Sequence, residues 1–489
     1  MKKNEYLIIS FLALMLGLDA CQDNVIDLAP LSTLTEANFY QSAAELDKAV
    51  LGIYNRYQSR MPRDWALFEM PSDHLHMSNY RHIGGLEAVN NLDFQPENDL
   101  FRNFWQASYN GIFRANAVLT HLHVPQNYVA SQKEQLEGEA KFMRALFYFD
   151  LVRAFGAVPK VTSVLSVDAS KTLQRASEEE IYGLIVDDLK DAINTLPLKE
   201  DMATGRASRS AAVALLGKVY IYMEDWGNAL TYLNMVSDYN HALVDDFASL
   251  WKLESENNEE VIFAIKYLQN TNGHTLSSEF IPFYGVEGIS TAGYETAFLS
   301  WGLHKKYEVS DTRKDATITE YWKAPGSDDP LAWRPYVNKY AVPHSGYSSG
   351  IDLPVLRYAD IVLLKAEALY RLNQPAEALI ELNKIRTRAF GDTSHNYELV
   401  DISTLDAFLD KLLLERQLEL AFENQRWFDL VRTGRFIEEL DEVELSYNTT
   451  TQTAQVVTLN PQPHHRYFPI PQHEIDQAAP NVLVQNDGY

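Results

Sequence analysis

Cysteine is almost absent from this sequence, because Cys21 is the single cysteine among 489 residues. A lone cysteine excludes an intrachain disulfide framework and any cysteine-rich zinc site. The folded part of the chain must therefore be stabilised by its apolar core, and 46% hydrophobic residues in a chain of this length suffice for one. After residue 20, no stretch approaches eighteen consecutive apolar residues, so no second segment is predicted to span a membrane.

Positive charge is also scarce. The chain has 42 lysines and arginines against 67 aspartates and glutamates, which gives a formal net charge of −25. An acidic chain without a basic block repels both nucleic acid and anionic lipid headgroups. We therefore expect no nucleic-acid partner, and any attachment to a membrane must rely on something other than surface charge.

The N-terminus has the pattern of a targeting segment. Two lysines precede an apolar run from Tyr6 to Leu18, which as a helix would reach about 20 Å, too short for a ~30 Å hydrocarbon core. Such a run suits a secretory signal, and the following Leu-Asp-Ala-Cys at residues 18–21 resembles a bacterial lipobox, with Asp19 unusual in its middle position. We predict a lipoprotein signal peptide at residues 1–20, lipid attachment at Cys21, and a lipidated N-terminal leash at residues 21–35.

Helical periodicity dominates the rest of the chain. Two segments match a tetratricopeptide helix pair, in which small residues twelve apart let two helices approach closely: Gly217 with Ala229, and Ala366 with Ala378. Residues 60–102 and 267–350 lack this periodicity and are rich in aromatic and polar residues, as functional loops are. The predicted fold class is all-α, with tetratricopeptide-like helix pairs forming a scaffold and long irregular loop insertions.

Several ordered motifs resemble the SusD/RagB family of Bacteroidota outer-membrane lipoproteins. Residues 357–368 (RYADIVLLKAEA) and 425–434 (QRWFDLVRTG) resemble its helix signatures, and residues 468–476 and 485–489 resemble its tail. Ala479-Pro480-Asn481 stands where the family usually has Asn-Pro. The resemblance implies a SusD-like domain at residues 36–489, with an N-terminal half at about 36–255 and a C-terminal SusD/RagB half at about 256–489.

The resemblance also implies a function. Members of this family are cell-surface lipoproteins of the outer membrane that capture oligosaccharide and deliver it to a SusC-like TonB-dependent transporter, over which they act as a lid. Some relatives capture peptides instead. For this chain the resemblance therefore implies an oligosaccharide ligand, a transporter partner and a lipid anchor in the outer membrane facing the cell exterior. We predict no enzymatic activity, cofactor or metal ligands from the sequence, in which no ligand spacing supports a calcium site and the presence of calcium stays open.

The two insertions supply the candidate ligand-binding residues. Sugars present flat C–H faces ringed by hydroxyls, so they are recognised by exposed aromatic rings together with polar side chains. Both insertions combine these residue types, in the candidate set Trp65, Asp73, Asn79, Tyr80, Arg81, Tyr284, Tyr294, Trp322, Trp333, Arg334 and Tyr336. Other charged residues are expected to be structural, because they lie on one helical face or inside a loop: Arg426, Asp429, Arg432, Asp311 and Arg313.

Enzyme motifs receive little support. Residues 346–350 match G-x-S-x-G, but prolines 343 and 354 flank them where a nucleophile elbow needs a strand and a helix. His74 and His76 lack the H-E-x-x-H context of a zinc enzyme and are expected to lie at the surface. An all-α glycoside hydrolase built from distant carboxylates stays open as an alternative, as does a helical-repeat scaffold that binds only protein.

Overall fold

A computed structural model describes residues 39–489 of the chain. Cys21, the predicted signal peptide and the leash lie outside the described residues. Eight helices that pack as four pairs form most of the described scaffold: α2 (Ala43–Arg60), α5 (Asp99–His121), α6 (Gln132–Phe155), α8 (Glu178–Thr195), α9 (Arg209–Tyr222), α10 (Trp226–Val236), α14 (Tyr358–Arg371) and α15 (Pro375–Phe390).

Local sequence fixes where several of these helices begin and end. α2 and α8 each begin with a capping box, formed by Ser42 with Glu45 and by Ser177 with Glu180. In both boxes the serine and glutamate satisfy backbone N–H groups that the first helical turn leaves free. α6 ends at Gly156, whose φ of 70° is readily adopted only by glycine.

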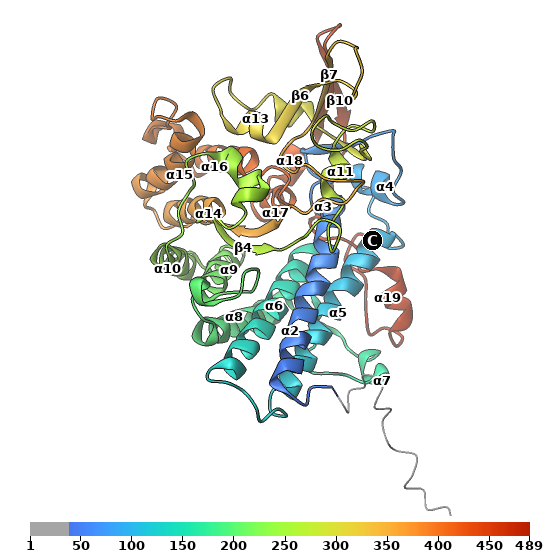
Figure 1. Cartoon of the computed structure of the whole chain (residues 1–489), viewed down its shortest axis with the longest axis vertical. Helices are drawn as coiled ribbons and strands as arrows, with labels where there is room; N and C mark the ends of the chain where they lie inside the picture. Colours follow the sequence, from blue (N-terminus) through green and yellow to red (C-terminus); the bar gives the residue numbers. More distant parts are fainter. Residues whose placement is uncertain (1–38) are drawn as a thin grey trace, which may run out of the picture.

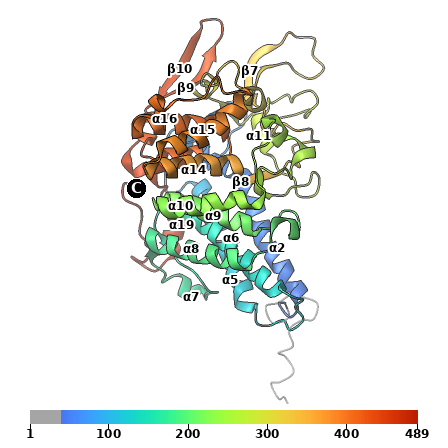
Figure 2. The same cartoon turned by 90° about the vertical axis from the view of Figure 1, so that its left-hand side faces the viewer.

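The long helices pack in sequence order as four neighbouring pairs. α2 packs on α5, α6 on α8, α9 on α10 and α14 on α15, and α6, α8 and α10 connect each pair to the next. Figures 1 and 2 show this row, with α2 and α5 at one end and α14 and α15 toward the other. Gly217 lies in the α9–α10 interface, where a Cβ would come within 2.9 Å of Leu233. The helix pairs predicted at both segments are therefore present.

The first insertion lies between α2 and α5. It contains the elements η1 (Met61–Arg63), α3 (Trp65–Phe68), β1 (Leu75–Met77) and α4 (Leu86–Asn90). α7 (Val167–Ser170), β2 (Val158–Pro159) and β3 (Arg175–Ala176) lie between α6 and α8, and η2 (Lys199–Asp201) precedes α9.

The segment between α10 and α14 includes the second insertion, residues 267–350. Its elements are η3 (Ser237–Tyr239), η4 (Phe247–Trp251), η5 (Leu253–Ser255), β4 (Val261–Ile265), α11 (Leu276–Phe280), β5 (Ala297–Leu299), α12 (Trp301–His304), α13 (Arg313–Thr317), β6 (Ile318–Trp322), β7 (Ala332–Val337) and β8 (Leu353–Arg357). The chain ends with η6 (Leu399–Ile402), α16 (Leu405–Glu419), α17 (Arg426–Arg432), α18 (Phe436–Glu439), β9 (Glu442–Asn448), β10 (Thr453–Thr458), η7 (Pro463–Arg466) and α19 (Gln472–Gln477).

The prediction of an all-α chain needs correction. The described residues contain five two-stranded sheets, pairing β1 with β5, β2 with β3, β4 with β8, β6 with β7 and β9 with β10. Each strand is only two to seven residues long, too short for alternating hydrophobicity to stand out from loop sequence. The fold is therefore mainly helical, with small sheets in the segments that connect the long helices and near the C-terminus.

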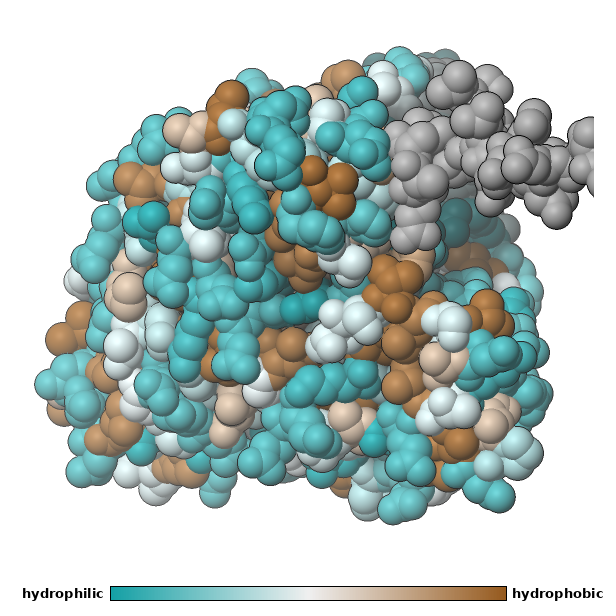
Figure 3. Space-filling model, turned by 90° about the horizontal axis from the view of Figure 1, so that it is seen from below, coloured by the Kyte–Doolittle hydropathy of each residue, from teal (hydrophilic) through white to brown (hydrophobic). Residues whose placement is uncertain are grey.

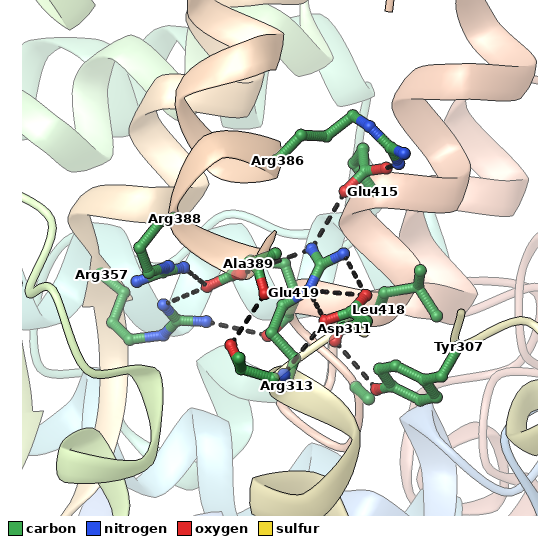
Figure 4. Close-up of polar contacts among 12 residues, drawn as sticks. Tyr307, Asp311, Arg313, Arg357, Arg386, Arg388, Ala389, Glu415, Leu418 and Glu419 are labelled. Atoms are coloured by element: carbon green, nitrogen blue, oxygen red, sulfur yellow. Dashed lines mark hydrogen bonds and ion pairs between the residues drawn. The ribbon is translucent and has the colours of Figure 1, made fainter. Parts of the chain in front are cut away.

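A buried ion-pair network attaches the second insertion to the helices α15 and α16 (Figure 4). Arg313 binds Asp311 at 2.7 Å and Glu415 at 3.0 Å, while Glu419 accepts hydrogen bonds from Arg357 and Arg388. Tyr307 of the insertion also donates a hydrogen bond to the backbone carbonyl of Leu418 in α16 at 2.9 Å. The insertion is therefore attached to α16 both by ion pairs and by this hydrogen bond.

A second buried network surrounds α17. Asp429 binds Arg416 at 2.7 Å and Arg432 at 3.0 Å, and Arg426 binds Asp73 of the first insertion at 2.8 Å. The charged residues that the sequence marked as structural, in α17 and at Asp311 and Arg313, do form ion pairs inside the protein.

Among residues 39–489, no helix is both long and apolar enough to cross a membrane. The face seen from below, near α2 and α5, is mostly hydrophilic, with apolar residues scattered singly and in small groups (Figure 3).

Candidate functional site

The two insertions meet in space, although residues 103–266 separate them in sequence. Strand β1 pairs antiparallel with β5, placing His76 opposite Phe298. Ser300 donates its backbone N–H to the carbonyl of His74 at 2.8 Å, and Ser78 donates its backbone N–H to Thr296 at 3.1 Å. Figure 1 shows the resulting group of loops and hairpins around α4, α11, β6, β7 and β10, at the opposite end from the start of α2.

An aromatic platform forms where these loops meet. We define it as Tyr80, Phe283, Tyr284 and Trp322, together with Arg334. Tyr80 is 47% exposed, Phe283 42% and Tyr284 59%, while Trp322 is half-buried. The rings of Tyr80 and Phe283 stack at 5.8 Å, and those of Tyr284 and Trp322 at 6.4 Å. Large rings left open to water in this number at one place are unusual for a surface that binds nothing.

Arg334 holds the platform together. Its guanidinium lies 4.9 Å from the Tyr80 ring centre and 4.8 Å from that of Trp322. Its Nε donates to the buried carboxylate of Glu295 at 2.6 Å. Trp322 is fixed separately, because its indole N–H donates to the carbonyl of Gly285 at 2.7 Å. The rings are therefore pre-positioned by ion pairing and hydrogen bonding.

A second stack contains Arg81, Tyr294 and Tyr347. Arg81 lies 3.7 Å from the Tyr294 ring centre and binds Glu279 through one nitrogen at 2.8 and 2.9 Å. Tyr294 stacks on Tyr347 at 4.1 Å with the ring planes only 8° apart. Tyr347 is 39% exposed, so this stack also has an aromatic ring open to water.

A pocket of about 470 Å³ adjoins the platform and shares Arg334 with it. Trp301 stacks on His304 at 4.6 Å and on Tyr447 of β9 at 4.2 Å, and Trp333 meets it edge-on at 6.1 Å. Polar groups accompany these rings, and the lining includes His76, Asn79, Trp301, His304, Trp333, Arg334, Ser446, Tyr447 and Gln455. Aromatic walls with a few polar groups are typical of a small-molecule site.

Both imidazoles of the pocket are neutral at pH 7. Burial lowers the pKa of His76 to about 4. Burial also lowers the pKa of His304, against the opposing effect of its hydrogen bond with Glu320. Within residues 39–489, the Nδ1 atom of His304 is buried with no hydrogen-bond partner, although its Nε2 lies 2.8 Å from Glu320.

The structure places eight of the eleven predicted residues in this region. Asn79, Trp333 and Arg334 line the pocket, Tyr80, Tyr284 and Trp322 belong with Arg334 to the platform, and Arg81 and Tyr294 form the second stack.

The other three predicted residues are core residues and need correction. Trp65 is 3% exposed and packs edge-on against Phe280, Asp73 is 7% exposed and binds Arg426, and Tyr336 is 6% exposed. In both insertions some aromatic and polar side chains are buried and others are exposed. Composition alone does not show which positions are buried.

Several residues of the site were not anticipated. Phe283 and Tyr347 lie in the second insertion and share its aromatic composition, which could have identified them. Trp301 and His304 belong to the short helix α12, while Tyr447 and Gln455 come from the β9–β10 hairpin, outside both insertions. Only folding brings that hairpin to the pocket, so no local signal marks it.

The enzyme motifs are not supported by their surroundings. Residues 346–350 lie in an irregular loop between β7 and β8, without the strand and helix that a nucleophile elbow requires. His74 is buried and lies 2.7 Å from Glu69, so the expectation of a surface histidine there is wrong. Across residues 39–489, no group of three or more His, Cys, Asp or Glu side chains is arranged to hold a metal ion.

Comparison with known proteins gives consistent matches over nearly the whole chain. A model of the SusD family matches residues 330–489, and a family model described as "Starch-binding associating with outer membrane" matches residues 26–221. SusD-like protein P25 of Formosa agariphila is 24% identical over 99% of both chains. SusD-like protein P2 of the same organism is 27% identical over 87% of this chain and 90% of its own.

Solved structures show the same fold. A laminarin binding SusD-like protein matches with a TM-score of 0.74 and 26% identity, covering 92% of this chain and all of its own. Surface glycan-binding protein A from Bacteroides thetaiotaomicron matches with a TM-score of 0.75 and 23% identity, with the same coverage, which shows the fold alone. From the two family models, the full-length relatives and the shared fold, we conclude that the chain belongs to the SusD family.

Proposed function

We propose that this protein is a cell-surface glycan-binding lipoprotein that captures oligosaccharide and delivers it to a SusC-like TonB-dependent transporter in the outer membrane. The observation that carries the proposal is the aromatic platform, whose exposed rings lie beside a pocket lined by neutral imidazoles and amides. Flat apolar rings next to hydrogen-bonding groups match the two kinds of surface that a sugar presents.

The platform suits a ligand that is bound and then released. One ring covering about 70 Å² of sugar contributes roughly 1.5–2 kcal/mol at ~25 cal/mol/Å². Two or three such rings, after the cost of association, leave a dissociation constant of about micromolar to millimolar. Such affinity fits a protein that passes its ligand to a transporter.

The relatives support carbohydrate as the ligand class. One structural neighbour is a laminarin binding protein, and one matching family model is described as starch-binding and associated with the outer membrane. Attachment to that membrane would use Cys21 after removal of residues 1–20. Membership of the SusD family supports the proposed transporter partnership.

Calorimetry with a panel of oligosaccharides tests the proposal. Trp322→Ala and Tyr284→Ala should each weaken binding about 10- to 30-fold, which is the loss of one stacking ring. Phe113→Ala is the matched control, because Phe113 is a 51% exposed ring on α5, away from the platform. Equal affinities in all four proteins would refute the platform as the binding site.

Three further measurements separate the competing functions. Binding of peptides but not of any oligosaccharide would support peptide capture by the same lid mechanism. Release of new reducing ends during incubation with polysaccharide would support the glycoside hydrolase. Copurification with a transporter without any glycan affinity would support a scaffold that binds only protein.

The helix pairs form the scaffold of the protein, and none of the described residues at the proposed ligand site belongs to them. We infer that α9–α10 and α14–α15 are tetratricopeptide-like, supported by the close approach at Gly217 and by the three-residue connections within each pair. The scaffold gives the insertions a rigid base on which the rings of the platform keep their positions.

A further inference from the structure

The cations around the proposed glycan site are paired with carboxylates. Arg81 binds Glu279 at 2.8 Å, and Arg334 binds Glu295 at 2.6 Å through its Nε. At the edges of the site Lys305 binds Glu444 at 2.6 Å, and Lys314 binds Glu320 at 2.6 Å. The positive charge of these four side chains is therefore already balanced.

The two pairs at the centre of the site cannot separate easily. Glu279 is 5% exposed and Glu295 1% exposed, and Glu279 also accepts a hydrogen bond from Thr275 at 3.0 Å. If an arginine left its partner to bind a ligand anion, a buried carboxylate would lose its compensating charge, which is costly in a protein interior. Each of these arginine–glutamate pairs can therefore offer N–H donors to a ligand while the pair as a whole has no net charge.

The other charged groups near the site, taken together, also disfavour an anionic ligand. The β6–β7 loop carries one exposed cation, Lys323, together with two exposed acids, Asp328 and Asp329. His76 and His304 add no charge at pH 7, because burial lowers the pKa of each. The whole chain has a net charge of −25, so an approaching anion is repelled at long range as well.

We propose that this site selects uncharged oligosaccharides and discriminates against those bearing carboxylate or sulfate groups. The inference rests on the proposed glycan-binding function and goes beyond it by naming the ligand class. Stacking on the platform rings needs only the apolar faces of the sugar, while an added anionic group would lose its hydration and meet two arginines that are already paired with buried carboxylates. The buried carboxylates Glu279 and Glu295 are the residues that determine this specificity.

Binding measurements on the intact lipoprotein with a glycan panel test the inference. The panel contains neutral glucans, mannans, xylans and galactans, and anionic polyuronate and sulfated-galactan oligosaccharides of matched length. We expect a neutral oligosaccharide to bind at least about tenfold more tightly than any anionic one. An anionic oligosaccharide that binds as tightly as the best neutral one would overturn the inference while leaving the proposed function intact, whereas no binding to any glycan would refute the proposed function itself.

Glu279→Gln tests the mechanism of discrimination. It removes the charge that compensates Arg81, so the affinity for anionic oligosaccharides relative to neutral ones should rise by about fivefold, the strength of one exposed ion pair. Glu137→Gln is the matched control, because it makes the same charge change on α6, where Lys141 keeps Asp191 as a partner at 2.7 Å. An unchanged ratio in a folded Glu279→Gln protein would overturn the role of this carboxylate.

The salt dependence of binding by the unaltered protein provides a measurement that needs no variant. Binding of a neutral ligand should change less than about twofold between 0.05 and 0.5 M NaCl, because no ligand charge is screened. A roughly tenfold weakening of the best ligand over that range would show that binding depends on charge attraction, and would overturn the inference.

Discussion

Glu419 belongs to the buried ion-pair network that joins the second insertion to α15 and α16. Its carboxylate, at the end of α16, is fully buried and accepts hydrogen bonds from Arg357 and Arg388, with Arg313 of the second insertion 3.7 Å away (Figure 4). Glu419→Gln keeps the shape of the side chain and removes its charge. Three arginines would then share the carboxylates that remain in the network.

The expected loss can be worked out from this geometry. Breaking a buried ion pair by removing one partner costs about 3–5 kcal/mol, because the opposite charge stays buried without compensation. At about 2.1 cal/mol/K of unfolding entropy per residue, roughly 450 folded residues give about 0.9 kcal/mol/K. Glu419→Gln should therefore lower the melting temperature at pH 7 by about 3–5 °C.

The effect should depend on pH in a definite direction. Burial alone would raise the pKa of Glu419, but Arg388, Arg357 and Arg313 outweigh it and hold the pKa well below its ordinary value of 4.5. A carboxylate with a lowered folded-state pKa stabilises the protein above its unfolded pKa and loses this contribution as the pH falls. The difference in melting temperature between Glu419→Gln and wild type should be largest above about pH 5 and should shrink steadily below pH 4.5.

Thermal unfolding followed by circular dichroism from pH 3 to 8 measures both effects. Glu438→Gln is the control, since the Glu438 side chain is 75% exposed in its pair with Arg435, and it should shift the melting temperature by less than about 1 °C. A Glu419→Gln protein that melts within 1 °C of wild type at pH 7, or a difference that grows on acidification, would refute the reasoning.

Three further predictions concern other parts of the chain. Gly217→Ala should destabilise the protein by about 1–3 kcal/mol, because its Cβ would meet Leu233 at 2.9 Å; Gly183→Ala on α8, with no atom within 4 Å, should not destabilise it, and urea unfolding compares the two. Burial raises the pKa of Asp64 to about 7, so the stability that the protonated carboxyl contributes is lost as the pH rises from about 4 through 7. Asp64→Asn should remove this loss and stabilise the protein at pH 8 by up to about 4 kcal/mol. An unchanged dependence of unfolding on pH in the variant would contradict this prediction. Cys21→Ala should move the protein from the membrane fraction to the soluble fraction while glycan binding persists, and loss of both together would show that the anchor assignment is incomplete.

Much of the scaffold could be predicted from the sequence because its determinants are local. Helical stripes of apolar residues, capping serines and helix-ending glycines act within a few residues of each other. The small residue at Gly217 even indicated where two helices approach closely. The short strands escaped prediction, because a pair such as β1 and β5 exists only through contacts between distant segments.

The candidate site was predictable in composition but not in detail. The insertions contain the right residue types, and eight of the eleven candidates lie at the site. Whether a given ring points outward depends on packing, which placed Tyr284 at the surface and Trp65 in the core. Tyr447 belongs to neither insertion and reaches the pocket only because β9 packs against α12.

The sequence by itself determined the acidic charge, the single cysteine, the helical scaffold and the motifs of the SusD family, since each is a property of composition or of short-range spacing. Only the tertiary structure decided which rings share a surface and which cations there are already neutralised. Arg334 and Glu295 are separated by 39 positions, and Arg81 and Glu279 by 198. Contacts over such separations follow from how loops pack on a rigid base, and no local pattern in the chain encodes them.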